Sequence, residues 1–473
     1  MKPAILFLTL TVFTCGCMVG PNYKRPMINV PSTYLGAPPQ ETGQLAEGSE
    51  QPQSSEQSFG DQKWFEAFQD PQLQELIRTA LKQNYDVQIA AARILEAQAQ
   101  LGITRADQLP TVSAGGAAVN NRNAQQKPLP EYETSATSLG ATFAWELDFW
   151  GRYRRATEAA RANLLATEWA RRAVINTLVT NVAAAYFQLR AYDLQLEISR
   201  RTLDSRQSSL RLTQTLANAG ATNMLDVRQA EQLVAVAAGS IPDLERSIQQ
   251  QENLISILLG NNPGPIARGM KLTEQPHLPE VPPGIPSRLL ERRPDIRAAE
   301  AQLMAANAQI GVARAAYFPQ ITLTANSGFQ SSALTNLFTG PAGFWSFGGS
   351  LVQPIFAGGR IKSGVRLAEA RKRELVLTYQ QTIQQAFRGV SDALVGYQKS
   401  REFRQHQEEL VVAARDAARL SDVRYRGGAA SYLEVLTNDT NAFSAELDLV
   451  RAQLNELLGL VDIYRNLGGG WQS

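Results

Sequence analysis

Histidine and cysteine are scarce in this chain of 473 residues, which contains two of each. The histidines, His277 and His406, are far apart in the sequence, and no set of His, Cys, Asp or Glu has the spacing of metal ligands. No glycine-rich loop connects a strand to a helix in the way that phosphate-binding loops do. These absences argue against an enzyme, and we expect no catalytic residue, no bound metal and no cofactor.

Net charge is also nearly absent. The 46 Lys and Arg residues against 44 Asp and Glu leave a formal charge of +2. No basic cluster is interleaved with aromatic residues, as nucleic-acid binding would require. The sequence therefore gives no sign of a nucleic-acid partner, and its charges have the helical spacing of solvated faces.

The N-terminal residues have the pattern of an export signal. Lys2 is followed by an apolar run over 4–13, which is too short to span a bilayer. The step from Gly16 to Cys17 resembles the end of a bacterial lipobox, so we expect cleavage before Cys17 and lipidation of its thiol. Met18 rather than Asp follows, which favours sorting to the outer membrane. An ordinary signal peptide with two incidental cysteines is the alternative.

Two segments have the composition of connectors. Residues 27–60 are rich in Pro, Gln, Glu and Ser and poor in apolar residues, which predicts a tether. Residues 261–294 contain eight prolines and separate two halves with similar patterning.

Each half contains a predicted pair of strands. Apolar and mostly polar residues alternate over 139–150, which indicates a strand with one apolar face, and a weaker strand precedes it over 111–120. The second pair is expected over 321–326 and from Trp345. Four strands are too few to close a barrel, whose smallest form has about eight. They would span a membrane only if several chains pooled them. A small soluble sheet that joins long helices is the alternative.

A long helix follows each strand pair. Residues 152–219 contain neither Gly nor Pro, which predicts a helix roughly 100 Å long at 1.5 Å per residue. A break at Gly220 leads to a shorter helix that ends near Leu259, and the second half repeats this order. Leucines at every seventh position of the first long helix predict a coiled-coil seam or, equally, ordinary core. They are Leu189, Leu196, Leu203 and Leu210.

The chain is therefore an internal duplication. The stretches "LGITRADQLPTVSA" and "IGVARAAYFPQITL" match at an offset of 209 residues, where a helix gives way to a strand in each copy. The expected fold class is mainly α, with duplicated long hairpins and four strands per chain. The expected segments are a signal peptide (1–16), a lipid-anchored tether (17–60), a first repeat (61–260), a connector (261–292) and a second repeat (293–473).

Seven segments in order carry a resemblance to a known family: "CMVGPNYKRP", "WFEAFQDPQLQELI", "WELDFWGR", "LLERRPDIRAAEAQL", "QPIFAGGR", "RYRGGAASYLEVL" and "LGGGW". The chain resembles the outer membrane factors of tripartite efflux, the TolC/OprM family, in its lipoprotein, NodT-like branch. The resemblance implies a homotrimer in which four strands per chain form one twelve-stranded membrane β-barrel. It also implies a periplasmic tunnel made by the α-hairpins.

The function that this resemblance implies is a passive exit duct in the outer membrane. It would receive small toxic compounds from an inner membrane RND-type transporter through a periplasmic adaptor protein. The same fold serves as the exit channel of type I protein secretion, which is one alternative. A lipid-anchored coiled-coil scaffold that does not conduct is another.

The two predicted helical turns occupy corresponding positions, 208 residues apart. Gly220 and Gly428 fit the end of a helix, where a positive φ is tolerated. As the tips of hairpins, the turns would contact the adaptor, as the resemblance implies, or would be plain turns. The candidate contact residues are Gly220, Thr222, Asn223, Gly428 and Ser431.

Each turn is followed by an apolar residue and then an acidic one. Three copies around one axis would bring leucines together to occlude water and carboxylates together to favour cations. The resemblance places a periplasmic gate here: Leu433 matches an apolar ring, Thr437 stands where Asp is common, and Glu434 could replace that acid. It also implies hydrogen bonds of Tyr425 that hold the helices closed. A core leucine and a solvated acid are the alternative. The candidate gate residues are Leu225, Asp226, Tyr425, Leu433, Glu434 and Thr437.

Overall fold

A computed structural model describes most of the chain. The described residues are 18–31, 33–35, 58–124, 132–276, 281–282 and 284–471. The predicted signal peptide, the predicted lipidation site Cys17 and much of the predicted tether lie outside them. Among the described helices, none is both long and apolar enough to cross a membrane.

Two compact units divide the chain, and each contains segments of both halves. One consists of Met1–Met27, Arg93–Glu168 and Ala298–Gln380, and the other of Ile28–Ala92, Trp169–Arg297 and Gln381–Ser473.

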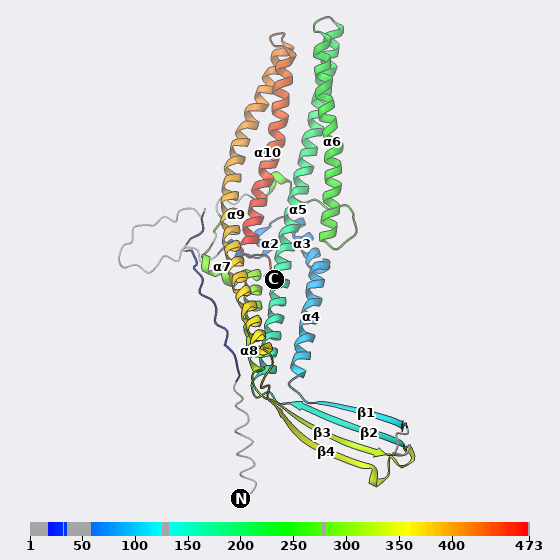
Figure 1. Ribbon diagram of the computed structural model, residues 1–473. Helices are drawn as coiled ribbons and strands as arrows, with labels where there is room; N and C mark the ends of the chain where they lie inside the picture. Colours follow the sequence, from blue (N-terminus) through cyan, green and yellow to red (C-terminus); the bar gives the residue numbers. More distant parts are fainter. Residues whose placement is uncertain are drawn as a thin grey trace, which may run out of the picture. The chain divides into compact units, whose positions relative to one another are not determined.

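The first half has the predicted order of elements (Figure 1). Its helices and strands are α2 (Trp64–Ala67), α3 (Pro71–Gln83), α4 (Tyr85–Ala106), β1 (Thr111–Asn123), β2 (Tyr132–Glu146), α5 (Arg152–Asn218) and α6 (Met224–Leu258). The short α7 (Pro286–Arg292) lies in the proline-rich connector.

The second half repeats the first. Its elements are α8 (Pro294–Ala315), β3 (Gln320–Ser331), β4 (Gly343–Val352), α9 (Arg360–Arg426) and α10 (Tyr432–Asn466). Both long helices have 67 residues, α6 and α10 both have 35, and α4 and α8 both have 22. The predicted duplication is therefore confirmed, and the corresponding helices have identical lengths.

The predicted strand over 139–150 differs from β2 at both ends. The strand begins earlier, and residues 147–150 leave it. The ring of Trp150 stacks on Phe318 at 4.7 Å between centroids, and its indole N–H donates to the carbonyl of Pro319 at 2.8 Å. These contacts end the strand although the alternation of residues continues.

All four strands form one antiparallel sheet in the order β1-β2-β3-β4. Side chains of directly paired residues share a face, and successive residues face opposite sides. The register therefore gives one row of Val112, Phe143, Ala325 and Phe347, and beside it, on the opposite face, a row of Ser113, Thr142, Asn326 and Ser346. The sheet has one apolar face and one polar face, as the alternation predicted.

A buried carboxylate joins several segments of the second unit. Asp70 is completely buried at the N-terminus of α3 and accepts hydrogen bonds from the Tyr186 hydroxyl at 2.9 Å, the Met270 amide at 3.0 Å and the Gln275 side chain at 3.1 Å. Burial raises the pKa of Tyr186, and the nearby Asp70 carboxylate adds to this effect, so the hydroxyl remains a donor. The connector is therefore held against α3 and α5.

The predicted leucines of α5 differ in burial, although Leu210 at the far end packs against the core of Ala230, Tyr432 and Val435. Leu189 is fully buried, whereas Leu196, Leu203 and Leu210 are half-buried. The fully buried positions with a spacing of seven are polar: Ser199, Arg206 and Thr213. Arg206 has charged and carbonyl partners on this enclosed face.

The predicted tether is wrong at its two ends. Met18–Arg25 contacts α5 and α8 through hydrogen bonds that include a buried Arg155. Ser58 caps a short 3-10 helix whose first residue, Phe59, is 1% exposed. The composition of 27–60 does not reveal the second contact, because a single aromatic side chain makes it, and the first lies outside that stretch.

Candidate functional site

The first helical turn ends α5 with a glycine in the left-handed region. Gly220 has φ +69°, its N–H donates to the Ala217 carbonyl, and the N–H of Ala221 reaches back to Leu216 at 2.9 Å. This pair of bonds satisfies carbonyls at the helix end. Asn223 then caps α6 by accepting from the Asp226 amide at 3.1 Å.

The second turn has the same backbone. Gly428 has φ +71° and donates to the Tyr425 carbonyl, and the N–H of Ala429 reaches back to Arg424 at 2.8 Å. Helix α10 begins after Ser431, whose side chain forms no capping bond. The tips predicted from Gly220 and Gly428 are thus matched turns, and the structure places Thr222 and Ser431 in corresponding loops.

The apolar candidate gate residues are exposed in the single chain. Leu225 is 63% exposed and Leu433 is 56% exposed, at the starts of α6 and α10. Within one chain, neither leucine belongs to the core. Apolar side chains at matching positions remain available to a second copy of the chain.

Acidic candidates differ between the two turns. Asp226 accepts from the hydroxyl of Thr222 within its own turn. Glu434 lies 3.4 Å from the guanidinium of Arg424, which belongs to the preceding helix α9. The exposed Thr437 donates its hydroxyl to the Leu433 carbonyl at 2.9 Å, as a helical threonine commonly does.

The expected hydrogen bond of Tyr425 does not form among the described residues. Its hydroxyl is buried and has no hydrogen-bond partner there, while its ring packs edge-on against Tyr432 at 5.2 Å. Both rings belong to a small core with Ala230 and Val435, which joins α6 to the second hairpin. Burial raises the pKa of Tyr432, so its hydroxyl stays neutral. Aromatic packing therefore holds this point of the hairpins.

Sequence reasoning missed a buried arginine that joins three helices. Arg206 of α5 pairs with Asp439 of α10 at 2.7 Å, donates to the Leu233 carbonyl of α6 at 2.9 Å, and lies over the Phe443 ring at 4.9 Å. Its side chain is 2% exposed. The sequence signal was the charge of Arg206 between two leucines of the predicted seam, Leu203 and Leu210.

A second group of charges joins the same hairpins. Glu446 of α10 accepts from Arg201 of α5 and from Arg415 of α9, at 2.5 Å each. Its side chain is 10% exposed, so two arginines neutralise an acid that has little water around it. These ties lie between helices and are not arranged for chemistry.

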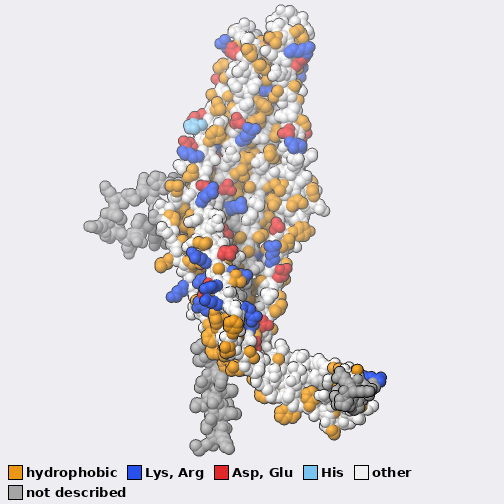
Figure 2. Space-filling model, in the orientation of Figure 1, with side chains coloured by type: hydrophobic (Ala, Val, Ile, Leu, Met, Phe, Trp, Pro, Cys, Tyr) orange, Lys and Arg blue, Asp and Glu red, His pale blue; other side chains and the backbone are white. Residues whose placement is uncertain are grey.

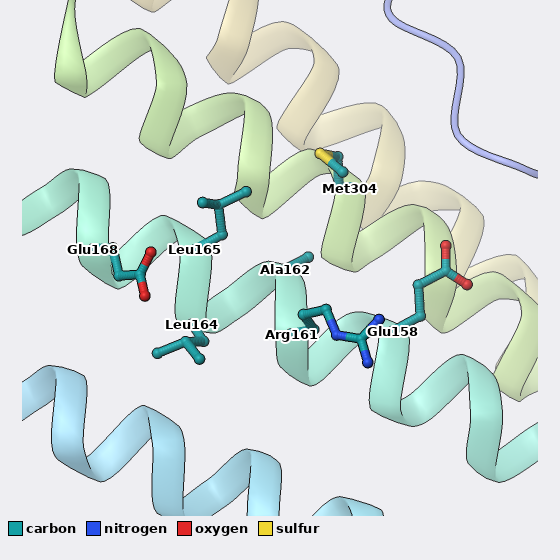
Figure 3. A pocket seen from close by; sticks show the side chains of 7 residues that line it. All are labelled: Glu158, Arg161, Ala162, Leu164, Leu165, Glu168 and Met304. Atoms are coloured by element: carbon teal, nitrogen blue, oxygen red, sulfur yellow. The ribbon is translucent and has the colours of Figure 1, made fainter.

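A groove of about 450 Å³ runs along α5 and reaches Met304 of α8 (Figure 3). In the close-up, Leu164 and Leu165 extend in different directions, and the carboxylates of Glu158 and Glu168 lie at opposite ends of the row. No polar groups converge on one point, as a catalytic site requires. The lining residues are Glu158, Arg161, Ala162, Leu164, Leu165, Glu168 and Met304. The described residues also hold no cluster of His, Cys, Asp and Glu suited to a metal ion.

Charge is confined to the ends of the sheet. Among the described strand residues, only Arg122, Glu133 and Glu146 are charged, and all three lie near strand ends. Figure 2 shows the contrast, since charged side chains are interspersed over the helices and nearly missing from the sheet in that view. The strand interiors carry a band without charge, as a bilayer core requires.

The duplicated helical hairpins, and a sheet whose apolar face carries charge only at its ends, are the features of an outer membrane channel subunit. The chain belongs to the outer membrane efflux protein family, whose model matches residues 76–261 and 285–469.

Known relatives and structures agree over nearly the whole chain. It is 37% identical to the toluene efflux pump outer membrane protein TtgC of Pseudomonas putida, over 100% of this chain and 96% of that protein. It is 34% identical to SilC of Salmonella typhimurium, described as a "probable outer membrane lipoprotein", over 99% of each. The open state of the MtrE outer membrane channel of Neisseria gonorrhoeae superposes with a TM-score of 0.82 and 30% identity, over 96% of this chain and 99% of that one.

Proposed function

We propose that this outer membrane protein is the passive exit duct of a tripartite efflux system and works as a homotrimer. One observation carries the proposal: the sheet is apolar on one face, polar on the other, and free of charge between its ends. Such a sheet meets lipid with the first face and an aqueous passage with the second. The family of efflux channels to which the chain belongs supports this use.

Three copies are proposed because the sheet is incomplete. In the described residues, β1 and β4 each pair on one side only, so the sheet has two open edges. Unpaired backbone groups are not tolerated in the hydrocarbon of a bilayer. Pairing of β4 with β1 of the next copy would satisfy both edges, and three copies would close a β-barrel of twelve strands.

Energy and selection are assigned to partners of the duct. Both turns expose residues at hairpin ends, Asn223 and Ser431 among them, and we assign these tips, with the half-buried Thr222, to a periplasmic adaptor. The adaptor would connect the duct to an RND-type pump of the inner membrane. This chain is about equally similar to TtgC, which is named for toluene, and to SilC, which is not. Similarity of the duct therefore does not identify the transported compound. The transported compounds are therefore assigned to the pump.

The second turn is proposed as the periplasmic gate. Three exposed copies of Leu433 around the axis would exclude water from the passage, and three copies of Glu434 would favour cations. The pairing of Glu434 with Arg424 keeps the turn closed against α9.

An acyl anchor on Cys17 is proposed as the second attachment to the outer membrane. Each buried CH₂ contributes about 0.8 kcal/mol, so more than one chain gives stable anchoring. The description of SilC as a lipoprotein supports this assignment. Intact mass of the mature protein tests it: an unmodified Cys17 contradicts the anchor, and Cys17→Ala should lose the lipid and still form pores.

Recording from planar bilayers tests the duct itself. Purified protein should give discrete conductance steps, and native mass spectrometry of the same sample should give a trimer. A non-conducting scaffold gives no steps. An exit channel for type I protein secretion conducts as well, but deletion of its gene abolishes export of a protein and leaves the efflux of a small fluorescent dye unchanged. We expect the reverse.

A further inference from the structure

The first described residues contact the start of α5 and run along α8. Figure 1 shows the chain after Met18 as a dark blue trace beside α8. The N–H of Val19 donates to the Trp150 carbonyl at 3.0 Å, and Met18 lies against Gly151, just before α5 begins. This segment is therefore attached where β2 gives way to α5.

A buried arginine of α5 binds the same segment. Arg155 is 3% exposed and donates to the carbonyls of Val19 and Gly20 at 3.2 Å each and to the Asn22 side chain at 2.9 Å. The carboxylate of Glu158, at 2.7 Å, balances the positive charge of Arg155. Four of the bonds that a guanidinium can make are thus committed, three of them to the N-terminal segment.

Helix α8 also contacts this segment. The Asn307 side chain donates to the Pro21 carbonyl at 2.8 Å, and Glu300 pairs with Arg25 at 2.8 Å. At Gly311 the segment touches the helix backbone: a Cβ there would lie 2.7 Å from the Val19 carbonyl oxygen. Gly20 has φ +108° and is equally close to Gly311, so neither position accepts a side chain.

The duplication supplies an internal reference for this contact. Gly102 of α4 corresponds to Gly311 of α8 at the offset of 209 residues, and nothing lies within 4 Å of a Cβ placed on it. The two helices share the glycine and differ in what covers it. Helix geometry alone therefore does not explain the tight approach at Gly311.

We propose that Met18–Arg25 is a docked strap that fixes the lipid-bearing end of the chain at the junction of sheet and helix, with Arg155 as its positioning residue. This rests on the proposed lipid at Cys17. Consecutive Cα atoms are about 3.8 Å apart, so a lipid on the residue before Met18 is tied to this junction. A flexible tether of about 30 residues would instead have a root-mean-square end-to-end distance of roughly 30 Å. The strap thereby sets the acyl chains level with the end of the apolar sheet face.

Limited trypsin digestion of the full-length protein in membranes tests the docking. Lys24 is exposed within the strap, and cleavage after it would release the N-terminal fragment with its lipid. Digestion requires local opening, so the cleavage rate reports the docked fraction. Gly311→Ala should raise the rate at Lys24 by about tenfold or more, although alanine is the better helix former. Arg155→Ala should do the same.

Two matched variants serve as controls. Gly102→Ala makes the same change at the open counterpart, and Arg161→Ala removes an exposed arginine two turns along α5. Both should digest at Lys24 as the parent does. If Gly311→Ala is as resistant as Gly102→Ala, the strap is not docked and the proposal fails.

The role of the strap is measured on the same variants. Intact mass should show the lipid retained on Gly311→Ala, while its assembly into trimers in the outer membrane should be slower than that of Gly102→Ala. Equal assembly rates with a released strap would overturn the positioning role. An unlipidated parent would contradict the anchor alone, because digestion at Lys24 still decides whether the strap docks.

Discussion

The two helical turns share a backbone and differ in their side-chain chemistry. Both end a helix of 67 residues with a glycine in the left-handed region and the same pair of backbone bonds. In the first turn Asn223 caps α6 and Asp226 is engaged locally. In the second, Ser431 forms no side-chain cap, and Glu434 depends on Arg424 of the neighbouring helix. The first turn is self-contained, and the second is held by a contact between helices.

The same contrast continues along the shorter helices. Asp439 of α10 receives the buried Arg206 of the other hairpin. Its counterpart 208 residues earlier, Glu231, is paired with Arg228 on its own helix α6 at 2.7 Å. Duplication preserved helix lengths, and divergence placed the ties between hairpins on α10. A movement of the second hairpin must therefore strain the pairs of Arg206 with Asp439 and of Arg201 with Glu446.

Removal of Arg206 should have the largest effect on stability. Arg206→Ala leaves Asp439, which is 29% exposed, without its partner and uncovers the Phe443 ring. Breaking a fully buried pair costs about 3–5 kcal/mol, and we expect a loss near the lower end of that range because Asp439 is partly solvated. We expect a clear fall in the thermal unfolding midpoint followed by circular dichroism. Arg211→Ala, an exposed arginine on the same helix, should change stability by no more than about 0.5 kcal/mol. Equal midpoints for the two variants would show that the three-helix tie does not stabilise the fold.

The leucines of α5 should follow in the order of their burial. Leu189→Ala should cost roughly 2–5 kcal/mol because the side chain is fully buried. Leu203→Ala should cost clearly less, since that side chain is half-buried. Thermal unfolding of the trimer compares them. A larger loss for Leu203→Ala would mean that neighbouring copies bury it in the assembly.

Loss of the capping side chain should destabilise the first turn and not the second. Asn223→Ala removes the cap of α6 and should cost about 1 kcal/mol. Ser431→Ala removes a side chain that caps nothing, so its effect should stay near zero. Hydrogen exchange in the first turn of α6 and of α10 measures both locally. Matching increases in exchange would contradict the difference between the turns.

The pair of Arg424 and Glu434 should have the smallest effect on unfolding. The two side chains are 58% and 40% exposed, and exposed pairs contribute about 0–1 kcal/mol. Arg424→Ala should therefore leave the midpoint almost unchanged, and the residual difference should vanish in about 1 M salt, where charges are screened within roughly 3 Å. A large loss of stability would show that this pair contributes to the fold itself and not only to the position of the second turn.

Local sequence patterns predicted the helices and strands, but they did not predict the contacts between residues far apart in the sequence. The absence of Gly and Pro over 152–219 was sufficient for α5, because nothing in that stretch interrupts a helix. The pairing of Arg206 with Asp439 joins residues 233 apart, and no periodicity encodes such a partner. The docked strap was read as tether because its bonds come mainly from backbone carbonyls, which composition does not register.

The candidate gate shows the same limit. Positions after each turn were found from their apolar-acidic order, and their exposure agrees with use by several copies. The expected hydrogen bond of Tyr425 was wrong within the protomer, because its ring packs on Tyr432 and its hydroxyl faces the interior.

Single-channel conductance in planar bilayers tests most directly whether the second turn closes the duct. Leu433→Ala combined with Glu434→Ala should raise conductance and lower the preference for cations. The matched double variant, Leu225→Ala with Asp226→Ala, changes the self-contained turn and should differ less from the parent. If the Leu433→Ala, Glu434→Ala protein has the conductance and cation preference of the parent, the gate does not lie at the second turn.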